Sequence, residues 1–319
     1  MSQIEAIAAY RDEIEYIFSQ AEQEIGSFPA GLSGLGHALL KRSNPLQNGG
    51  GANVISYLLP YWFREQTGSP LELCRDLAIG NIYAMLHFFL LDDVMDGGTG
   101  RLDSGVRGSL ALGQLLQGQF QQRYQRHFAA DSPLWDYYRK YLGEWAAAVF
   151  SEGAQPIDPY DPGQLARKAA PVKLCAAGLL MHATRQEKIA AAEEAVDLAL
   201  AVLQLSDDWA DWRDDLPEPG CNGFLSLVRE KLGLSADCVL DEKRVKRAIY
   251  HRQCLEQLAD VVEKYGERLR QLSVAPQSLI AFQQEIARGI RNNAQGVNAS
   301  VESLAAEGGI SYFLTKFHK

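Results

Sequence analysis

The chain has 319 residues, of which 47% are hydrophobic and 22% charged, with 28 glycines and 12 prolines. This composition excludes collagen-like, low-complexity and generally disordered proteins. The formal net charge is −9, so no cationic excess is available to bind a nucleic acid or an anionic membrane, and an anionic ligand would need bound cations.

Apolar residues recur at three- and four-residue spacing in almost every long segment, and no sustained stretch alternates apolar and polar residues as half-buried strands do. The sequence therefore predicts an all-α protein. In chain order, the expected helices fall near residues 3–26, 54–66, 71–95, 106–129, 133–151, 163–184, 187–213, 241–272 and 276–306. No composition shift, long linker or internal repeat divides them, so we expect a single α-helical domain over residues 1–319.

The remaining general signals favour a cytoplasmic protein. The five cysteines are scattered without a C-x-x-C spacing, which indicates neither a zinc site nor a disulfide framework. The N-terminal residues carry charges every few positions, unlike a signal peptide. The longest apolar stretch, Ile82 to Leu91, is about ten residues long, well below the roughly 20 needed to span a bilayer. We expect no membrane-spanning segment.

A first cluster of aspartates, Asp92, Asp93 and Asp96, ends the helix expected over residues 71–95. Asp92 and Asp96 share one face, where like charges repel and carboxylates near a helix C-terminus oppose its dipole. A bound cation would relieve both effects. Phe88 and Met85 lie beneath Asp92, so an apolar stripe leads to the acidic end.

A second cluster ends the apolar helical run that finishes near Leu205. It contains five aspartates: Asp207, Asp208, Asp211, Asp214 and Asp215. The first, third and fifth recur every four residues, close to the helical period, and can therefore project toward one point. The other two flank that line.

Three interpretations of these clusters are possible. A solvated acidic surface explains one cluster, but two similar clusters at helix ends favour a site. An EF-hand calcium loop is excluded, because Val94 or Trp209 stands where its third position needs an oxygen ligand and Trp212 where its sixth needs glycine. Carboxylates without histidine or thiolate suit Mg²⁺, which binds a few carboxylates together with substrate phosphates and water. The implied ligand is a diphosphate.

At this point the sequence resembles the class I isoprenoid synthase superfamily, in which two aspartate-rich helix ends face each other across a central cavity in an all-α bundle. FFLLDDVMD matches its first motif at Asp92, Asp93 and Asp96. LQLSDDWADWRDD matches the second motif of chain-elongating prenyltransferases and also the metal triad of terpene cyclases. The corresponding residues are Asp207, Asp208 and Asp211 for the former and Asp207, Asp211 and Asp215 for the latter.

Departures from the elongating enzymes favour a terpene synthase. Those enzymes hold a second, non-allylic diphosphate with an early Gly-Gly-Lys-Arg motif and a paired Arg-Arg. Here the first region reads Gly49-Gly50-Gly51-Ala52-Asn53, which is interpreted as a turn, and the pair is reduced to Arg101-Leu102. The cyclase pattern is also incomplete, since Asp replaces the usual Asn and Ser of the triad and no Arg-Tyr pair follows near the C-terminus. Arg288 or Arg291 is the candidate substitute.

The resemblance implies a mechanism as well as a fold. Three Mg²⁺ ions would bridge the aspartates to the diphosphate of a linear allylic substrate, with Arg101 and Arg213 contacting its oxygens. Lys173 is a further candidate, for which a solvated lysine is the alternative interpretation. The allylic cation then needs apolar, aromatic walls. The candidates for those walls are Phe88, Phe89, Tyr83, Trp209 and Trp212.

Three functions remain open. A terpene cyclase leads; a trans-prenyltransferase, elongating or head-to-head, is the alternative; a non-enzymatic partner of a prenyl synthase is the third, and the retained aspartates argue against it. The resemblance also implies a possible homodimer.

Overall fold

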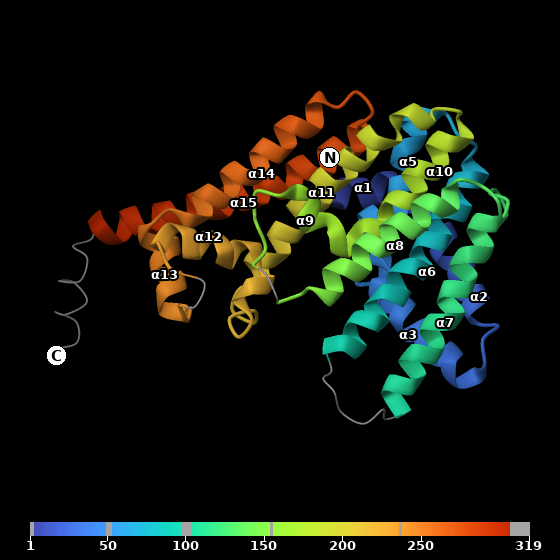
Figure 1. Ribbon diagram of the computed structural model, residues 1–319, viewed down its shortest axis with the longest axis horizontal. Helices are drawn as coiled ribbons and strands as arrows, with labels where there is room; N and C mark the ends of the chain where they lie inside the picture. Colours follow the sequence, from blue (N-terminus) through green and yellow to red (C-terminus); the bar gives the residue numbers. More distant parts are fainter. Residues whose placement is uncertain (1–2, 49–52, 97–103, 154–155, 236–237, 307–319) are drawn as a thin grey trace. The chain divides into compact units, whose positions relative to one another are not determined.

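The computed structural model describes residues 3–48, 53–96, 104–153, 156–235 and 238–306. Every regular element within these ranges is a helix, and no strand occurs in them, as the sequence predicts (Figure 1). The α-helices are α1 (Gln3–Ala9), α2 (Arg11–Ile25), α3 (Ala30–Ser43), α4 (Pro45–Asn48), α5 (Val54–Thr67), α6 (Leu71–Asp96), α7 (Ser104–Gln125), α8 (Leu134–Phe150), α9 (Pro162–Ala166), α10 (Leu174–His182), α11 (Ile189–Asp211), α12 (Gly223–Leu232), α13 (Glu242–His251), α14 (Cys254–Gln271) and α15 (Gln277–Ala306). Three short 3₁₀ helices are η1 (Arg167–Lys173), η2 (Gln186–Lys188) and η3 (Pro219–Cys221).

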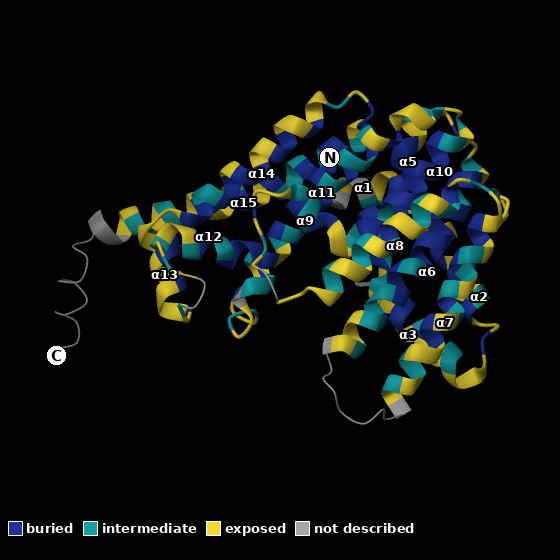
Figure 2. Cartoon of the chain, viewed as in Figure 1, coloured by how far each residue is buried: buried dark blue, intermediate teal, exposed yellow. Residues whose placement is uncertain are grey.

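The chain forms two compact units, and the first contains residues 1–142, 171–193 and 274–282. Helix α6 is its centre and packs against α2, α5, α7 and α10. Figure 2 shows α6 largely in the colour of buried residues. Helix α7 approaches α6 closely at Gly80, where a Cβ atom would lie 2.9 Å from the Tyr124 ring, so a larger residue would push the helices apart.

A buried ion network joins three helices of this unit. Arg123 of α7 donates to Asp76 of α6 and to Glu24 of α2. Asp76 also accepts hydrogen bonds from Arg126, at 3.0 Å, and from His127, at 2.8 Å. Several partners therefore compensate for the cost of burying the Arg123 guanidinium and the Asp76 carboxylate.

The last segment of this unit, residues 274–282, packs on α5. The rings of Trp62 and Phe282 lie 5.4 Å apart between centroids. The backbone N–H of Gln277 donates to Glu65 Oε2 at 3.1 Å, and the Ser278 hydroxyl donates to the same carboxylate. These contacts join parts of the chain that are more than 200 residues apart in sequence.

The second unit contains residues 143–170, 194–273 and 283–319. Helix α12 packs against α13 and α14, and Phe224, Leu225, Val228 and Leu258 are fully buried in its core. Arg291 of α15 donates to three carboxylates of α14, those of Glu256, Asp260 and Glu263. The chain passes from one unit to the other within α8, η1, α11 and α15, and once between α14 and α15. The single domain expected from the sequence stays a prediction.

Three α-helices were not predicted from the sequence, and three predicted helices are interrupted. The missed α-helices are α3, α4 and α12. The segment predicted over residues 163–184 is broken into α9, η1 and α10, with Pro171 inside η1, because proline cannot continue an α-helical hydrogen-bond pattern. The segment predicted over residues 241–272 is broken at Gln253, which has φ 53°. Tyr10 separates α1 from α2.

One described helix, over Leu71–Met95, is long and apolar enough to cross a membrane by length and composition alone. Of its most apolar window, 56% is buried inside the protein, which is typical of the core helix of a globular unit. All five cysteines are free, and Cys74, Cys175 and Cys254 are buried.

Candidate functional site

The first aspartate cluster lies in the first unit, in the last turn of α6. Asp92 and Asp93 are exposed there, and Asp96 is the final residue of the helix. The Asp96 side chain, Arg101 and residues 49–52, for which the sequence predicts a turn, lie outside the described residues. The structure therefore describes two of the three predicted carboxylates, those of Asp92 and Asp93, at the end of α6.

Below these carboxylates α6 becomes apolar and buried. Phe88 and Phe89 are half-buried, whereas Leu86 and Leu90 belong to the core. The Phe88 ring stands edge-on to His87, with centroids 5.2 Å apart. His87 is itself buried, and burial lowers its pKa. That Phe88 and Phe89 form an apolar wall stays a prediction.

The second cluster lies in the second unit, at the end of α11. Asp207 and Asp211 are one turn apart on the same helix face, and both are exposed. Neither side chain makes a hydrogen bond or ion pair with any residue that the structure describes. Burial raises the pKa of Asp207 to about 6, and the Asp211 carboxylate adds to the rise, although part of Asp207 remains in contact with solvent. Two carboxylates thus share a face, and no cationic side chain of the described ranges pairs with either.

Asp208 has a different environment from its neighbours. It is 3% exposed, its Oδ1 accepts from Gln204 Nε2 at 2.7 Å, and its Oδ2 accepts from the Gly223 N–H at 2.7 Å. A Cβ atom at residue 223 would lie 3.1 Å from Asp208 Oδ2, so glycine allows this close approach. Burial raises the pKa of Asp208 to about 7, and the two hydrogen bonds oppose that rise. Both carboxylate oxygens are occupied by protein donors.

Asp215 follows α11 by one turn. The backbone N–H groups of Asp214 and Asp215 donate to the Asp211 carbonyl at 2.9 and 3.1 Å, which continues the helical path past its last residue. Asp215 is half-buried, and its Oδ2 accepts from Asn222 Nδ2 at 2.7 Å. The sequence predicted Asp215 as a ligand but did not single out Asn222.

The basic candidates have partners of their own. Arg213 lies with its guanidinium carbon 4.6 Å from the Trp212 ring centroid, and its Nε donates to Glu242 at 3.4 Å. Lys173, in the first unit, is only 5% exposed, and its Nζ lies 5.0 Å from the Tyr141 ring centroid. The alternative of a solvated Lys173 is therefore wrong. Arg291 is occupied by three carboxylates, whereas Arg288 is exposed.

The aromatic candidates Trp209, Trp212 and Tyr83 differ in how far their side chains are exposed. Trp209 is half-buried and stands edge-on to Phe224 at 5.0 Å, so part of its indole is open. Trp212 is 3% exposed. Tyr83, in the first unit, is fully buried and donates to Glu24 at 2.8 Å, so it belongs to the core. Of these three, only Trp209 retains the exposure that a substrate wall needs.

A cavity of about 110 Å³ lies beside the second cluster. Gln204 lines it and also donates to Asp208, and Arg167 and Lys168 contribute positive charge to its wall. Lys168 donates to Glu152, whereas Arg167 makes no ion pair within the described part of the chain. The sequence analysis missed these two basic residues. Their position in the same basic segment as Lys173 was the available signal.

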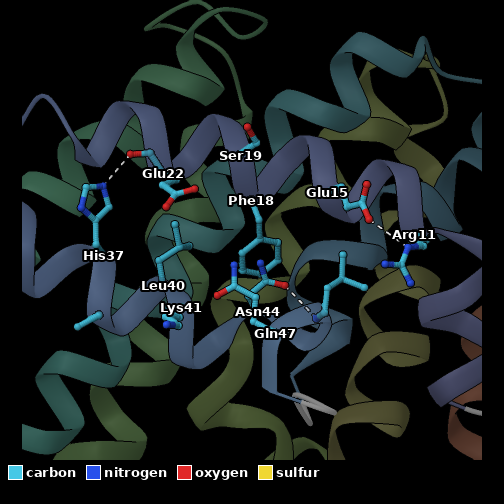
Figure 3. Close-up of a pocket in the computed structure, with 12 residues that line it drawn as sticks. Arg11, Glu15, Phe18, Ser19, Glu22, His37, Leu40, Lys41, Asn44 and Gln47 are labelled. Carbon is cyan, nitrogen blue, oxygen red and sulfur yellow. Dashed lines mark hydrogen bonds and ion pairs between the residues drawn. The ribbon is translucent and has the colours of Figure 1, made fainter.

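A larger cavity, of about 500 Å³, lies among α2, α3 and α4 of the first unit. Figure 3 shows Phe18 and Leu40 on its wall and the His37 ring directed at the backbone oxygen of Glu22, 3.0 Å away. Arg11 is already paired with Glu15. None of the lining residues belongs to either aspartate cluster, so this cavity does not enter the site.

Among the described residues, no group of three or more His, Cys, Asp or Glu side chains is arranged to hold a metal ion. Nevertheless, the donor chemistry at α11 fits magnesium. Asp207 and Asp211 offer hard oxygen ligands that no cation of a described residue occupies. Burial, and secondly the Asp211 carboxylate, raise the pKa of Asp207, and a divalent ion would stabilise its ionised form. That the two clusters face a common ligand stays a prediction.

No family model matches the chain, and no curated protein is similar to it in sequence. Solved structures are similar in fold. A farnesyl pyrophosphate synthase from T. brucei has a TM-score of 0.58 at 15% identity, covering 89% of this chain and 99% of that one. A geranylgeranyl pyrophosphate synthetase from the archaeon Geoglobus acetivorans has a TM-score of 0.59 at 14% identity, covering 90% and 98%. The chain therefore has the all-α isoprenoid synthase fold that its motifs predict.

Proposed function

We propose that this chain is a magnesium-dependent enzyme that ionises an allylic prenyl diphosphate. The observation that carries the proposal is the pair Asp207 and Asp211 at the end of an apolar helix, in a fold shared with prenyl diphosphate synthases. Neither carboxylate has a partner among the residues that the structure describes. Asp92, Asp93 and Asp96 form the other ligand group. Asp215 is the last of the proposed metal ligands. Asp208 is not one of them, because both its oxygens accept hydrogen bonds from the protein.

Bound magnesium, expected as three ions, supplies Lewis-acid stabilisation of the diphosphate leaving group. The chain's own part is to bind and orient that group. Arg213 reaches it by leaving Glu242, at little cost because this ion pair is exposed. Arg101 and Lys173 are further donors to the diphosphate oxygens, whose negative charge grows as the carbon–oxygen bond breaks.

Water must be kept from the resulting carbocation. Phe88 and Phe89 beneath the first cluster and Trp209 beside the second supply apolar faces. An aromatic face also stabilises a cation by about 0.5–2 kcal/mol. These three side chains are half-buried, so each has surface to offer a prenyl chain.

Prenyl transfer is the first candidate reaction. It is supported by the fold shared with a farnesyl and a geranylgeranyl pyrophosphate synthase along nearly their whole length, and by Asp207 and Asp211 in the transferase spacing. Cyclisation is the second candidate, because residues 49–53 offer no Lys or Arg for an acceptor diphosphate. A cytoplasmic location and a homodimer stay predictions.

The test is an incubation of the purified chain with Mg²⁺ and geranyl, farnesyl, geranylgeranyl or geranylfarnesyl diphosphate, each with and without isopentenyl diphosphate. Products are identified by mass spectrometry. Longer diphosphates that appear only with isopentenyl diphosphate establish prenyl transfer. A hydrocarbon or alcohol formed without it establishes cyclisation. If neither forms and the diphosphate stays intact, the proposal is wrong.

A further inference from the structure

Asn222 lies at the centre of the hydrogen bonds that follow α11. It is fully buried, and it immediately precedes α12. Its Nδ2 donates to the Asp208 carbonyl at 2.8 Å and to Asp215 Oδ2 at 2.7 Å, and its Oδ1 accepts from the Leu225 N–H at 2.8 Å. We infer that Asn222 is a positioning residue that holds the Asp215 carboxylate for a divalent cation, an inference that rests on the proposed function.

The amide of Asn222 can take only one orientation. Both hydrogens of Nδ2 are used by acceptors, and Oδ1 faces a backbone donor. Rotating the amide by half a turn would set its oxygen against two acceptors and its NH₂ group against an N–H, so all three bonds would be lost. Because Asn222 is buried, water does not compete for these hydrogen bonds. The direction in which Nδ2 points is therefore fixed.

Asp215 needs such a partner because helical geometry does not hold its side chain. Helix α11 ends at Asp211, and Asp215 follows in a turn. The bond from Asn222 engages Oδ2 only, and Oδ1 makes no hydrogen bond to a described residue. A neutral amide donor leaves the carboxylate charge intact, whereas Lys or Arg at residue 222 would compete with a metal ion. Hydrogen-bonded support of this kind is typical of carboxylates that bind metals.

The competing explanation is that Asn222 only caps α12. Asn222→Ser separates the two roles, because serine keeps an oxygen for the Leu225 N–H and is a good N-cap. Its single hydroxyl hydrogen cannot serve both Asp208 and Asp215. Asn222→Asp is the second variant: it has the same shape and keeps the capping oxygen but replaces the donor by an acceptor. Asp241→Ala is the matched control, because Asp241 caps α13 through the Arg244 N–H at 2.7 Å.

The experiment titrates Mn²⁺, as a paramagnetic probe for Mg²⁺, into the full-length chain with inorganic diphosphate, and measures free Mn²⁺ by electron paramagnetic resonance. Melting temperatures without metal are recorded in parallel. We expect the Mn²⁺ Kd to rise about 10–100-fold in Asn222→Ser, the range usual for loss of a residue that supports a ligand. Asp241→Ala should lower the melting temperature and leave the Kd unchanged.

An Asn222→Ser Kd within about twofold of wild type would overturn the inference and leave the cap as the only role. If that variant does not fold, Asn222→Asp decides by the same criterion. The same titration distinguishes a failure of the proposed function from a failure of the inference about Asn222. A wild-type chain that binds no Mn²⁺ with diphosphate overturns both conclusions, whereas wild-type binding that Asp207→Asn abolishes and Asn222→Ser preserves overturns only the role of Asn222.

Discussion

Adjacent aspartates of the second cluster have opposite environments. Asp207 is exposed on α11 and bonds to no side chain in the described ranges, whereas Asp208 faces α12 and is enclosed by Gln204 and Gly223. Successive helical residues point about 100° apart, because α-helices have 3.6 residues per turn. One step along α11 therefore separates a candidate metal ligand from a structural group.

Asp208→Asn should change how stability depends on pH. The raised pKa means that folded Asp208 keeps its proton up to about pH 7, whereas the unfolded residue loses it near its model value of 3.8. The contribution of Asp208 to stability is therefore greatest below about pH 4 and falls as pH rises to about 7, at most by about 4 kcal/mol. Asparagine removes this loss, and Gln204 can rotate its amide to accept from the new NH₂ group.

Urea unfolding measures this effect at about pH 4.0, close to the unfolded pKa, and at about pH 7.5, just above the folded pKa. The stability of Asp208→Asn relative to wild type should improve between the lower and the higher pH. Asp214→Asn, on an exposed residue of the same cluster, is the control and should show no such trend. A constant difference between Asp208→Asn and wild type would show that Asp208 is ionised throughout.

Asp207→Asn should lower activity by at least about 100-fold, because a metal contributes several kcal/mol to transition-state stabilisation and each 1.4 kcal/mol is tenfold in rate. Folding should be unaffected, since the carboxylate makes no bond to a described residue and repels Asp211. Product assays and melting curves on the same preparation test both parts. Retention of a tenth or more of wild-type activity would exclude Asp207 as a ligand.

Three elements of the first unit, α2, α6 and α7, are joined by the network around Arg123. Burial alone would raise the pKa of Asp76, but hydrogen bonds from His127 and Arg123 and nearby positive charge outweigh it and lower that pKa. Stability from Asp76 is thus present above its unfolded pKa and is lost as pH falls through the folded value, below about pH 4.

Arg123→Met should destabilise the chain by about 3–5 kcal/mol, because Asp76 and Glu24 lose their shared buried partner. Urea unfolding at neutral pH measures the loss, which should shrink as the carboxylates protonate in acid. Arg139→Met is the control, since the Arg139 and Asp136 side chains are both 70% exposed, and it should cost less than about 1 kcal/mol. Equal losses in the two variants would contradict a buried network.

The sequence predicts most of the α-helices, and it misses α3 and α12 for identifiable reasons. Helix α3 contains Gly31, Gly34 and Gly36, which lower helix propensity, yet Gly36 is buried where a Cβ atom would lie 2.7 Å from Ile25. Packing against α2 therefore outweighs propensity there. Helix α12 begins at Gly223, which propensity disfavours, but the Asn222 cap and the bond to Asp208 fix its start.

The sequence likewise predicts only part of the candidate site. The four-residue spacing correctly set Asp207 and Asp211 on one face of α11. It could not assign Asp208, because burial of that side chain depends on α12, which the sequence analysis missed. Asn222, Arg167 and Lys168 went unnoticed for the same kind of reason, since their contacts are made by folding and not by local pattern.

At the scale of the whole molecule, each compact unit is assembled from three separate stretches of sequence. The contact between Trp62 and Phe282 is one of the links that complete the first unit. Phe282→Ala should destabilise the chain by about 3–5 kcal/mol, the usual cost of truncating a buried phenylalanine.

Urea unfolding measures the loss, and Phe150→Ala provides the control because Phe150 is 93% exposed. The control should change stability by less than about 0.5 kcal/mol. If the two variants lose the same stability, the segment at residues 274–282 does not pack on α5 as described.

The contact between Trp62 and Phe282 also determines when the first unit can be completed during synthesis. A ribosome adding about 5–20 residues per second makes Phe282 roughly 10–40 s after Trp62. During that interval the face of α5 that carries Trp62 and Glu65 has no segment to cover it. The nascent chain therefore presents an unfinished apolar surface to chaperones until residues 274–282 have been made, and slower synthesis prolongs that exposure.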